Sequence, residues 1–286
     1  MKMIKPIVNL SKIVDEYDTF VFGFNGVLYN GDIIFPEAAS CLRNLAAIGK
    51  KIIIISNSCL RVDAMLDIIS RNGISMNNLT NVVTAGEILH YKLKFAQNEF
   101  AAIGNTYYHL GSRDDKGVFS KLTFRETMSI EQAHFLYMSG VASADDMVDT
   151  YRPILEQAVN LGLPFVCAGN NTSCFIGGKL GISSGAVAEA YAVLGGRIIT
   201  VGKPSVKILQ YALEGVENIG KVVVIGDNVS TDIKMASLLS YDSVLISKGR
   251  HVNYLGEGYI PDVAKTRELS NSYDVSPNCV ISAMRW

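Results

Sequence analysis

The stretch FVFGFNGVLYNG, residues 20–31, passes directly from an apolar, β-rich segment into a Gly-Val-Leu-Tyr turn. Apolar runs of this kind are typical of strands that are covered on both faces of a sheet. The turn that follows has the form of an active-site loop, yet the whole stretch contains no charged residue. Any chemistry at this loop therefore depends on groups that other segments of the chain supply.

Apolar β-branched runs alternate with segments of helical periodicity near both ends of the chain. This alternation predicts an α/β fold with a doubly wound parallel sheet. The first series comprises TFVFGF (19–24), EAASCLRNLAAIG (37–49), KKIIIISNS (50–58) and LRVDAMLDIISRNG (60–73). The second series comprises RIITVGK (197–203), PSVKILQYALEGV (204–216), KVVVIGDN (221–228), STDIKMASLLS (230–240) and SVLISKG (243–249).

The region between the two series has apolar runs of its own, HFLYMSGV (134–141) and LPFVCAGN (163–170), and no linker rich in Pro, Gly or Ser. It therefore has the features of a folded insertion. We expect a core domain formed by residues 1–84 and 197–286, with an αβ domain, residues 85–196, inserted between its two parts.

The bulk composition limits the possible functions. The chain has 286 residues, 49% of them hydrophobic, and a net charge of −1, which gives no attraction for nucleic acid. No apolar run approaches the roughly 20 residues of a membrane helix, so we expect no membrane partner. Five cysteines without Cys-x-x-Cys spacing favour a reduced, cytoplasmic protein. A mean hydropathy of +0.23 agrees with well-buried strands and with a homo-oligomer.

Polar segments follow four of the predicted strands. In open parallel sheets, ligands bind beyond the carboxyl ends of the strands, so these segments are expected to converge on one site. The segments are residues 23–26, 56–58, 202–205 and 226–232.

Asp227 and Asp232 lie in the last of these segments, five residues apart. Two carboxylates that open from one loop suit a hard cation such as Mg²⁺. The same residues also fit a plain turn, in which Ser230 or Thr231 caps the next helix and Asp232 balances its dipole. The segment alone leaves both interpretations open.

Two other segments offer groups for an anion. Lys203 precedes a helix with Pro204 at or near its first turn, and a lysine at this place can neutralise a phosphate. Ser56–Ser58 offer hydroxyls and, at a helix start, N–H groups that bind anions. A solvated lysine and an ordinary N-cap are the plainer interpretations of these two segments.

The order of these segments resembles the haloacid dehalogenase (HAD) superfamily. The chain reads x-x-x-Gly-Val-Leu-Tyr-x-Gly, then Ser-Asn-Ser, an insertion, Gly-Lys-Pro, and Gly-Asp-x-x-x-Thr-Asp. More narrowly, it is similar to the NagD-like (class IIA) phosphatases, which carry a large αβ cap between the second and third motifs. The stretch FIGGKLGISSGAVAEAYAVLGGRIITVGKPS (175–205) resembles the return from that cap to the core. The resemblance covers nearly the whole chain.

This resemblance implies phosphoryl transfer with Mg²⁺. In the family, an aspartate on the first strand attacks phosphorus and a second aspartate acts as acid and base. Mg²⁺, a hydroxyl and a lysine stabilise the transferring group. The nucleophile and acid/base positions fall on Gly23 and Asn25, the phosphate-binding positions on Ser56, Asn57, Ser58 and Lys203, and the metal positions on Asp227 and Asp232. The Asn-Pro-Asp substrate loop of the cap aligns with Gly169, Asn170 and Asn171.

Neither residue of the first motif can perform the family's chemistry. Gly23 has no side chain, and the amide of Asn25 cannot exchange a proton near neutral pH. The metal site has also lost one expected carboxylate, which predicts weakened or absent Mg²⁺ binding.

Few other residues are candidates for the missing nucleophile. Asp32 lies beyond the Gly31 turn, on a segment that leads away from the site. Cys59 would need a lowered pKa, and Arg61, which could provide it, is expected to be solvated. The four histidines have no metal-ligand spacing. His251 follows the last core strand and could border the site, but we expect it to be a plain loop residue.

Three functions are compatible with this sequence. The first is an inactive or severely impaired phosphatase-fold protein that keeps a cradle for phosphate or a small phosphorylated molecule. The second is a Mg²⁺-dependent phosphomonoester hydrolase with residual or altered activity. The third is a plain nucleotide-binding domain, but no Gly-x-Gly-x-x-Gly follows any strand. The first function is the one that the sequence favours.

Overall fold

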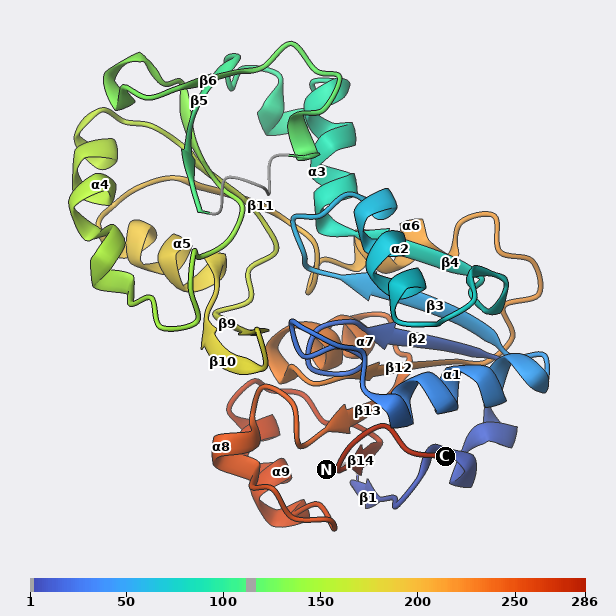
Figure 1. The fold of residues 1–286 in the computed structure, drawn as a ribbon. Coiled ribbons are helices and arrows are strands. Elements are labelled where there is room, and N and C mark those ends of the chain that lie inside the picture. The colour runs from blue at the N-terminus through green and yellow to red at the C-terminus, as the bar shows by residue number, and fades with distance from the viewer. Residues whose placement is uncertain (1–2, 112–116) are drawn as a thin grey trace. The chain divides into compact units, whose positions relative to one another are not determined.

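The computed structural model describes residues 3–111 and 117–286, in which helices surround three β-sheets (Figure 1). The described strands are β1 (Lys5–Pro6), β2 (Thr19–Gly23), β3 (Lys51–Ser56), β4 (Asn81–Thr84), β5 (Thr106–Leu110), β6 (Arg125–Thr127), β7 (Phe135–Met138), β8 (Phe165–Ala168), β9 (Ser173–Ile176), β10 (Lys179–Ile182), β11 (Ile198–Val201), β12 (Val222–Gly226), β13 (Asp242–Ile246) and β14 (Cys279–Ile281). The α-helices are α1 (Pro36–Ala47), α2 (Val62–Arg71), α3 (Ala85–Lys94), α4 (Val148–Asn160), α5 (Ser184–Val193), α6 (Val206–Leu213), α7 (Lys234–Leu238), α8 (Val252–Leu255) and α9 (Val263–Asn271), and a π-helix, η7 (Val229–Ile233), precedes α7.

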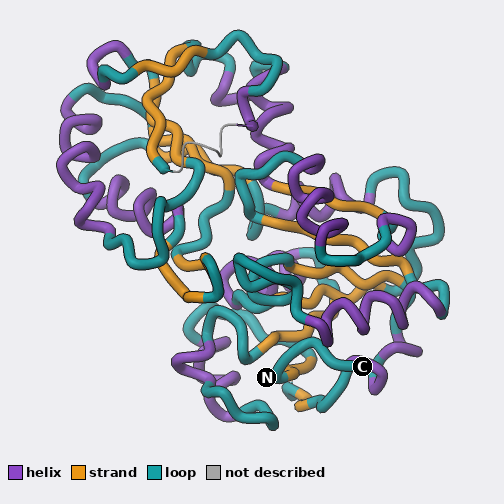
Figure 2. The backbone as a smooth tube through the Cα atoms, viewed as in Figure 1, coloured by secondary structure: helices purple, strands orange, loops and turns teal. Residues whose placement is uncertain are grey.

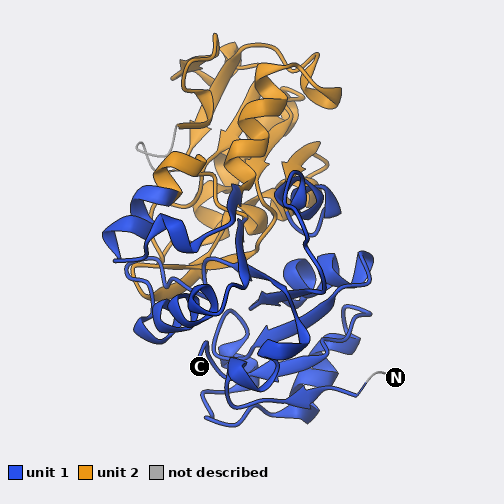
Figure 3. Ribbon diagram, turned by 90° about the vertical axis from the view of Figure 1, so that its right-hand side faces the viewer, with its two compact units in different colours: residues 1–56, 66–83, 203–286 blue, residues 57–65, 84–202 orange. Residues whose placement is uncertain are grey.

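The chain divides into two compact units (Figure 3). Unit 1 comprises Met1–Ser56, Leu66–Val83 and Lys203–Trp286, and unit 2 comprises Asn57–Met65 and Thr84–Gly202. The division expected from the sequence, with limits at residues 84 and 197, stays a prediction. The units differ from it in that Asn57–Met65 and the strand β11 belong to unit 2.

Unit 1 is built on a sheet with the order β1-β14-β13-β12-β2-β3-β4, and β2 pairs in parallel with both β12 and β3. All residues of β2 and β12 are buried, as their unbroken apolar sequences predict. The helix α1 covers one face of the sheet and α6 and α7 cover the other (Figures 1 and 2). The expected doubly wound α/β fold is confirmed.

The chain changes direction in this sheet at β2 and β12. From β2 it continues to β3 and β4 on one side, whereas β12, β13 and β14 follow one another on the other side. Ligands of open parallel sheets bind at such a switch point, beyond the carboxyl ends of the two strands, because the connections leave toward opposite sides. We call the group of residues at these strand ends the crevice of unit 1. Gly23 and Asp227 lie at or directly after these two ends.

Unit 2 has its own parallel sheet, with the order β11-β8-β7-β5-β6, and an antiparallel hairpin of β9 and β10. Alternate side chains of β7 point to opposite faces of the sheet, as the two-residue period of a strand requires. Phe135 and Tyr137 belong to one apolar cluster, and Leu136 and Met138 belong to another. Unit 2 therefore has a complete core of its own.

The starts of two helices in unit 1 can be compared with the sequence expectation. The helix α6 begins at Val206, and Pro204 lies two residues before it, near its first turn as expected. The cap of η7 is Asn228, whose side chain accepts a hydrogen bond from the Ser230 N–H at 3.0 Å. The capping role expected for Ser230 or Thr231 was wrong because an asparagine two residues earlier closes the turn. In the described part of the chain, every helix is too short or too polar to cross a membrane.

Candidate functional site

The crevice of unit 1 contains six of the residues predicted from the sequence. They come from the ends of β2, β3 and β12 and from the segment before α6. These residues are Gly23, Asn25, Ser56, Lys203, Asp227 and Asp232. Lys203, Asp227 and Asp232 are almost fully buried, with 5%, 4% and 2% of their surfaces exposed.

Lys203 and Asp232 form a buried ion pair. The Lys203 Nζ lies 2.7 Å from Asp232 Oδ1 and donates a second hydrogen bond to the Ile55 carbonyl oxygen at 3.1 Å. The other oxygen of Asp232 accepts the Asn228 N–H at 3.2 Å. Lys203 is thus fixed between the end of β3 and η7, and the interpretation of Lys203 as a solvated lysine was wrong.

Asp227 is enclosed by backbone. Its Oδ2 accepts the Arg250 N–H at 2.8 Å. Gly26, with a φ of +82°, lies so close that a Cβ there would be 1.9 Å from the same oxygen, and a Cβ on Gly249 would be 2.3 Å from the Asp227 Cβ. Burial raises the pKa of Asp227 to about 6; Arg250 opposes this shift and the charge of Asp232 adds to it.

Gly23 differs from these glycines because its backbone does not require glycine. Its φ is not in the left-handed region. A Cβ at this position would lie 3.4 Å from Asp232 Oδ1 and 3.2 Å from Val27 Cγ2, so a side chain there would point toward the charged groups. The backbone conformation at Gly23 would therefore accept other residues, and the assignment of position 23 to the nucleophile stays a prediction.

The residues present do not fit the magnesium site that the fold implies. Mg²⁺ keeps several waters and binds through carboxylate oxygens in octahedral geometry. Three of the four oxygens of Asp227 and Asp232 already accept hydrogen bonds from Lys203, Asn228 and Arg250. No group of three or more His, Cys, Asp or Glu residues in the described chain is arranged to hold a metal ion.

Of two neighbouring residues after β13 that contact this site, Arg250 was missed and His251 was only the less favoured alternative. Arg250 is only 8% exposed, and its N–H holds Asp227. The neighbouring His251 accepts the Val229 N–H through Nε2 at 3.3 Å, and burial lowers its pKa to about 4. The expectation of a plain loop residue at His251 was wrong. The available signal was that SVLISKG is itself a strand whose carboxyl end reaches the same crevice.

The other four predicted residues belong to unit 2, where two of them meet. The Asn57 Nδ2 donates a hydrogen bond to Asn171 Oδ1 at 3.1 Å, although the two residues are 114 positions apart. The backbone supports this contact, since a Cβ on Gly169 would lie 2.5 Å from the Asn57 carbonyl oxygen. Asn170, between Gly169 and Asn171, is exposed. The second motif and the predicted substrate loop are therefore joined within unit 2.

Ser58 does not begin the helix that follows. Its Oγ accepts the Leu60 N–H at 3.1 Å, and α2 starts only at Val62. The Val62 N–H donates to Glu87 at 3.0 Å, so a carboxylate from α3 takes the place that was expected for a serine cap. The expected helix start at Ser58 was therefore wrong, and the phosphate-binding role of Ser56, Asn57 and Ser58 stays a prediction.

Arg61 is not solvated as expected but paired with Glu87. Its guanidinium donates to both carboxylate oxygens, at 2.6 and 2.7 Å. Burial tends to raise the pKa of Glu87, but the bonds from Arg61 and Val62 outweigh it and lower the pKa. Among the suggested substitutes for a nucleophile, Cys59 is buried in the unit 2 core, and Asp32 is exposed on a turn.

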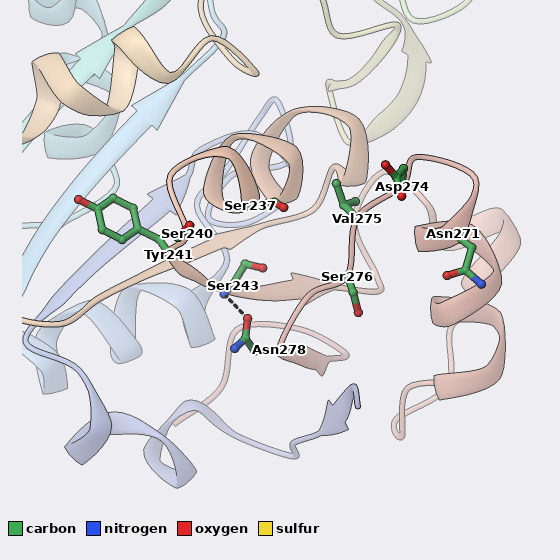
Figure 4. A pocket seen from close by; sticks show the side chains of 9 residues that line it. All are labelled: Ser237, Ser240, Tyr241, Ser243, Asn271, Asp274, Val275, Ser276 and Asn278. Carbon is green, nitrogen blue, oxygen red and sulfur yellow. Dashed lines mark hydrogen bonds between the residues drawn. The ribbon is translucent and has the colours of Figure 1, made fainter. Parts of the chain in front are cut away.

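A pocket of unit 1 lies near the amino end of β13, away from the carboxyl ends of the strands where the predicted site residues lie (Figure 4). It has a volume of about 680 Å³ and is lined mostly by hydroxyl and amide side chains. Ser243 and Asn278 form its floor, where the Ser243 N–H donates to Asn278 Oδ1 at 3.1 Å. None of the residues predicted for the site line this pocket.

Comparisons with known proteins agree with the geometry of unit 1. A model of haloacid dehalogenase-like hydrolases matches residues 20–125, and a second HAD hydrolase-like model matches residues 200–263. These two segments contain the crevice residues from β2, β3, the Lys203 segment and the η7 loop. No curated protein gives a significant match.

Three solved structures have the same fold. A haloacid dehalogenase-like hydrolase from Brucella suis is 27% identical, with a TM-score of 0.80, and the match covers 96% of this chain and 98% of that one. A possible sugar phosphatase from Cytophaga hutchinsonii is 17% identical, with a TM-score of 0.76 and coverage of 99% and 98%. A glycerol phosphate phosphatase from Mycobacterium tuberculosis in complex with magnesium is 17% identical, with a TM-score of 0.59 and coverage of 87% and 71%.

These matches span both parts of unit 1 and the segment between them, and they agree with the motif order read from the sequence. The chain belongs to the haloacid dehalogenase (HAD) superfamily of hydrolase-fold proteins.

Proposed function

We propose that this protein binds phosphate or a small phosphorylated molecule in the crevice of unit 1 and does not hydrolyse it at an enzymatic rate. The observation that carries the proposal is Gly23, which ends β2 at the switch point of the sheet and faces Asp232 without a side chain. Phosphoryl transfer through an enzyme-bound intermediate needs a nucleophile at this point.

The acid/base group is missing as well. Asn25 follows Gly23 by two residues, and an amide has no proton to exchange in the neutral range. Loss of the nucleophile alone cost about 10⁶ in turnover in a well-studied hydrolase. Residual hydrolysis by a bound water is therefore expected to fall far below the usual turnover of about 1–10³ s⁻¹.

The groups that recognise an anion are retained. Lys203 is held in place by Asp232 and the Ile55 carbonyl. Its side chain is already ordered, so the binding of an anion would cost little side-chain entropy. Ser56 ends β3 one residue beyond Ile55. The names of two solved neighbours, a possible sugar phosphatase and a glycerol phosphate phosphatase, suggest the class of ligand.

The test combines an activity assay with a binding measurement on the whole chain. With p-nitrophenyl phosphate and Mg²⁺, we expect turnover at least about 10⁴-fold below the usual enzyme range, while calorimetry detects binding of inorganic phosphate. Wild-type turnover within that range would overturn the proposal and support the alternative, a Mg²⁺-dependent hydrolase with another nucleophile. Absence of phosphate binding would overturn its binding half.

A restored variant sharpens this test. The double substitution Gly23→Asp and Asn25→Asp returns both carboxylates and is expected to raise turnover above the wild type in the presence of Mg²⁺. The matched control carries Gly23→Asn with Asn25→Asp, which has nearly the same volume but no nucleophile. Equal activities of these two variants would show that position 23 is not the nucleophile position.

A further inference from the structure

We propose that the pocket near the amino end of β13 is a second binding site, which takes a neutral polyhydroxylated molecule such as a sugar or a polyol. The pocket is separate from the crevice, because Ser243 lies near the start of β13, whereas the crevice residues lie at the carboxyl ends of the strands. The inference therefore goes beyond the proposed function and does not depend on phosphate binding.

The pocket has the size of a small-molecule site. Its volume of about 680 Å³ lies within the roughly 300–1,000 Å³ that is typical of ligand pockets. Its lining residues come from α7 and the turn after it, from the start of β13, and from the end of α9 with the loop that follows (Figure 4). All of these segments belong to unit 1, so one compact unit forms the whole pocket.

The floor of the pocket offers a buried hydroxyl group. Ser243 is only 3% exposed, and its hydrogen bonds within the described chain use its backbone alone. Its N–H donates to Asn278 Oδ1 at 3.1 Å, and its carbonyl oxygen accepts the Asn278 N–H at 2.9 Å. Figure 4 shows the Ser243 hydroxyl directed away from Asn278 and into the pocket. A buried hydroxyl without a partner is costly, and a ligand hydroxyl would supply the partner.

Asn278 keeps this floor in place. Besides its bond from the Ser243 N–H, its side-chain amide donates to the Asp242 carboxylate. That carboxylate also accepts a hydrogen bond from the Tyr17 hydroxyl at 3.1 Å. The amide is therefore held from both of its ends. A floor that is ordered before the ligand arrives lowers the entropic cost of binding.

Two wall residues occupy positions where glycine is favoured. Ser240 has a φ of +57° and Asp274 a φ of +52°. Ser240 lies in a helix-end motif, in which its own N–H and that of Tyr241 donate back to carbonyl groups of α7 at 3.1 and 2.9 Å, and the turn after α9 repeats this pattern at Asp274. Glycine is usual at the left-handed position of this motif because other residues are strained there. Both positions instead carry a polar side chain that lines the pocket, as a role in binding would require.

The chemistry of the lining groups selects the class of ligand. They are serine hydroxyls, asparagine amides, the Tyr241 phenol, the Asp274 carboxylate and the apolar Val275. No described Lys, Arg or His lines the pocket, so an anion would find no opposite charge and would be repelled by Asp274. An apolar ligand would leave the hydroxyl and amide groups unpaired. A polyhydroxylated molecule can donate to Asp274 and exchange hydrogen bonds with the serines.

Binding is tested on the whole chain by saturation-transfer NMR with D-glucose, D-ribose and glycerol as probes. We expect at least one of them to bind with a dissociation constant below about 10 mM, and to shift the backbone amide signals of Ser243 and Asn278 in isotope-labelled protein. Inorganic phosphate should leave these two signals unchanged. Absence of saturation transfer to all three probes at about 50 mM would overturn the inference, and so would shifts at these amides that only phosphate produces.

Three variants locate the binding site. Ser243→Ala removes the floor hydroxyl and is expected to weaken binding of the probe about tenfold. Ser240→Gly and Asp274→Gly remove wall side chains and are also expected to weaken binding. Neither glycine variant should lower the melting temperature, because glycine is unstrained at these φ values. Wild-type affinity in all three variants would overturn the inference.

The matched control is Asn218→Gly. Asn218 also has a left-handed backbone, with a φ of +49°, and belongs to unit 1, but it does not line the pocket. Its replacement should leave probe binding unchanged. An equal loss of binding in Asn218→Gly and the two wall variants would contradict the assigned site. If Ser243→Ala fails to fold, the two wall variants still decide the matter, since they introduce no strain.

Discussion

The ends of β2 and β12 lie side by side in the core sheet but have kept different amounts of charge. After β2, the positions expected to carry two aspartates hold Gly23 and Asn25. After β12, both expected aspartates are present, and each is hydrogen-bonded within the crevice. The two segments thus form one site with an empty half and a charged half.

This difference indicates that an aspartate in the site can be required for the stability of the fold rather than for catalysis. Asp232 neutralises a buried lysine, and removal of one partner from such a pair costs about 3–5 kcal/mol because the other charge stays unpaired. Position 23 carries no side chain, so it neutralises no buried charge. The stability of the fold therefore depends on the aspartates after β12, whereas it does not require aspartates at positions 23 and 25.

The largest expected effect comes from the charged half. Asp232→Ala should lower the free energy of unfolding by about 3–5 kcal/mol, because it leaves Lys203 as an uncompensated buried charge. Urea denaturation followed by circular dichroism measures the loss. Glu156→Ala breaks the exposed Arg152–Glu156 pair and should cost about 0.5 kcal/mol or less. Similar losses in the two variants would contradict the role given to the Lys203 pair.

A smaller effect is expected at the contact between the two halves. Gly26→Ala must place a methyl group on Asp227 Oδ2 as well as strain a backbone with a φ of +82°. Gly49→Ala introduces a comparable strain, at a φ of +74°, into open space and should cost about 1–2 kcal/mol. We expect Gly26→Ala to lower the melting temperature further than Gly49→Ala. Equal shifts would show that the first loop does not press on Asp227.

The pH dependence of stability should distinguish two groups in the charged half. His251 has a folded pKa of about 4, below its ordinary value of 6.5, so the unfolded chain binds more protons and stability falls as the pH drops through this window. Asp227 has a raised pKa of about 6 and acts in the opposite direction, since its contribution is lost as the pH rises toward 6.

The substitution His251→Gln isolates the first group while it keeps an acceptor for the Val229 N–H. Relative to the wild type, the variant should be more stable at pH 5 than at pH 7.5. Melting temperatures at the two pH values provide the measurement. A difference between the proteins that does not change with pH would show that His251 does not titrate in this window.

The smallest effect is expected in the empty half. Gly23→Ala places a Cβ 3.2 Å from Val27 Cγ2, a contact that a shift of a few tenths of an ångström relieves, and should change stability by less than about 1 kcal/mol. Gly226, at the end of the neighbouring strand, is the matched control, because a Cβ there would be 2.1 Å from the Asp232 Cβ. A large loss of stability in Gly23→Ala would mean that packing requires glycine at this position, and it would contradict the proposal that a catalytic side chain is missing there.

The sequence was sufficient to predict a doubly wound sheet and the carboxyl ends of β2, β3, β12 and β13, but it assigned β11 to this sheet, whereas β11 pairs with β8 in unit 2. Unbroken apolar runs such as Ile52–Ile55 can be satisfied only by a strand covered on both faces, and the alternation with helices leaves few topologies. The absence of carboxylates at Gly23 and Asn25 was equally plain, because a missing side chain needs no structure to be recognised.

The contacts between side chains that are distant in the sequence could be identified only from the three-dimensional structure. The pairing of Lys203 with Asp232, of Asn57 with Asn171 and of Arg61 with Glu87 joins residues that lie 29, 114 and 26 positions apart. Arg250 and His251 stood outside every recognised motif, and their place after a strand indicated only that they are near the site, not which groups they contact. Their roles depend on how closely the chain passes Asp227 and Val229, and such distances between remote segments are set by packing rather than by local sequence preference.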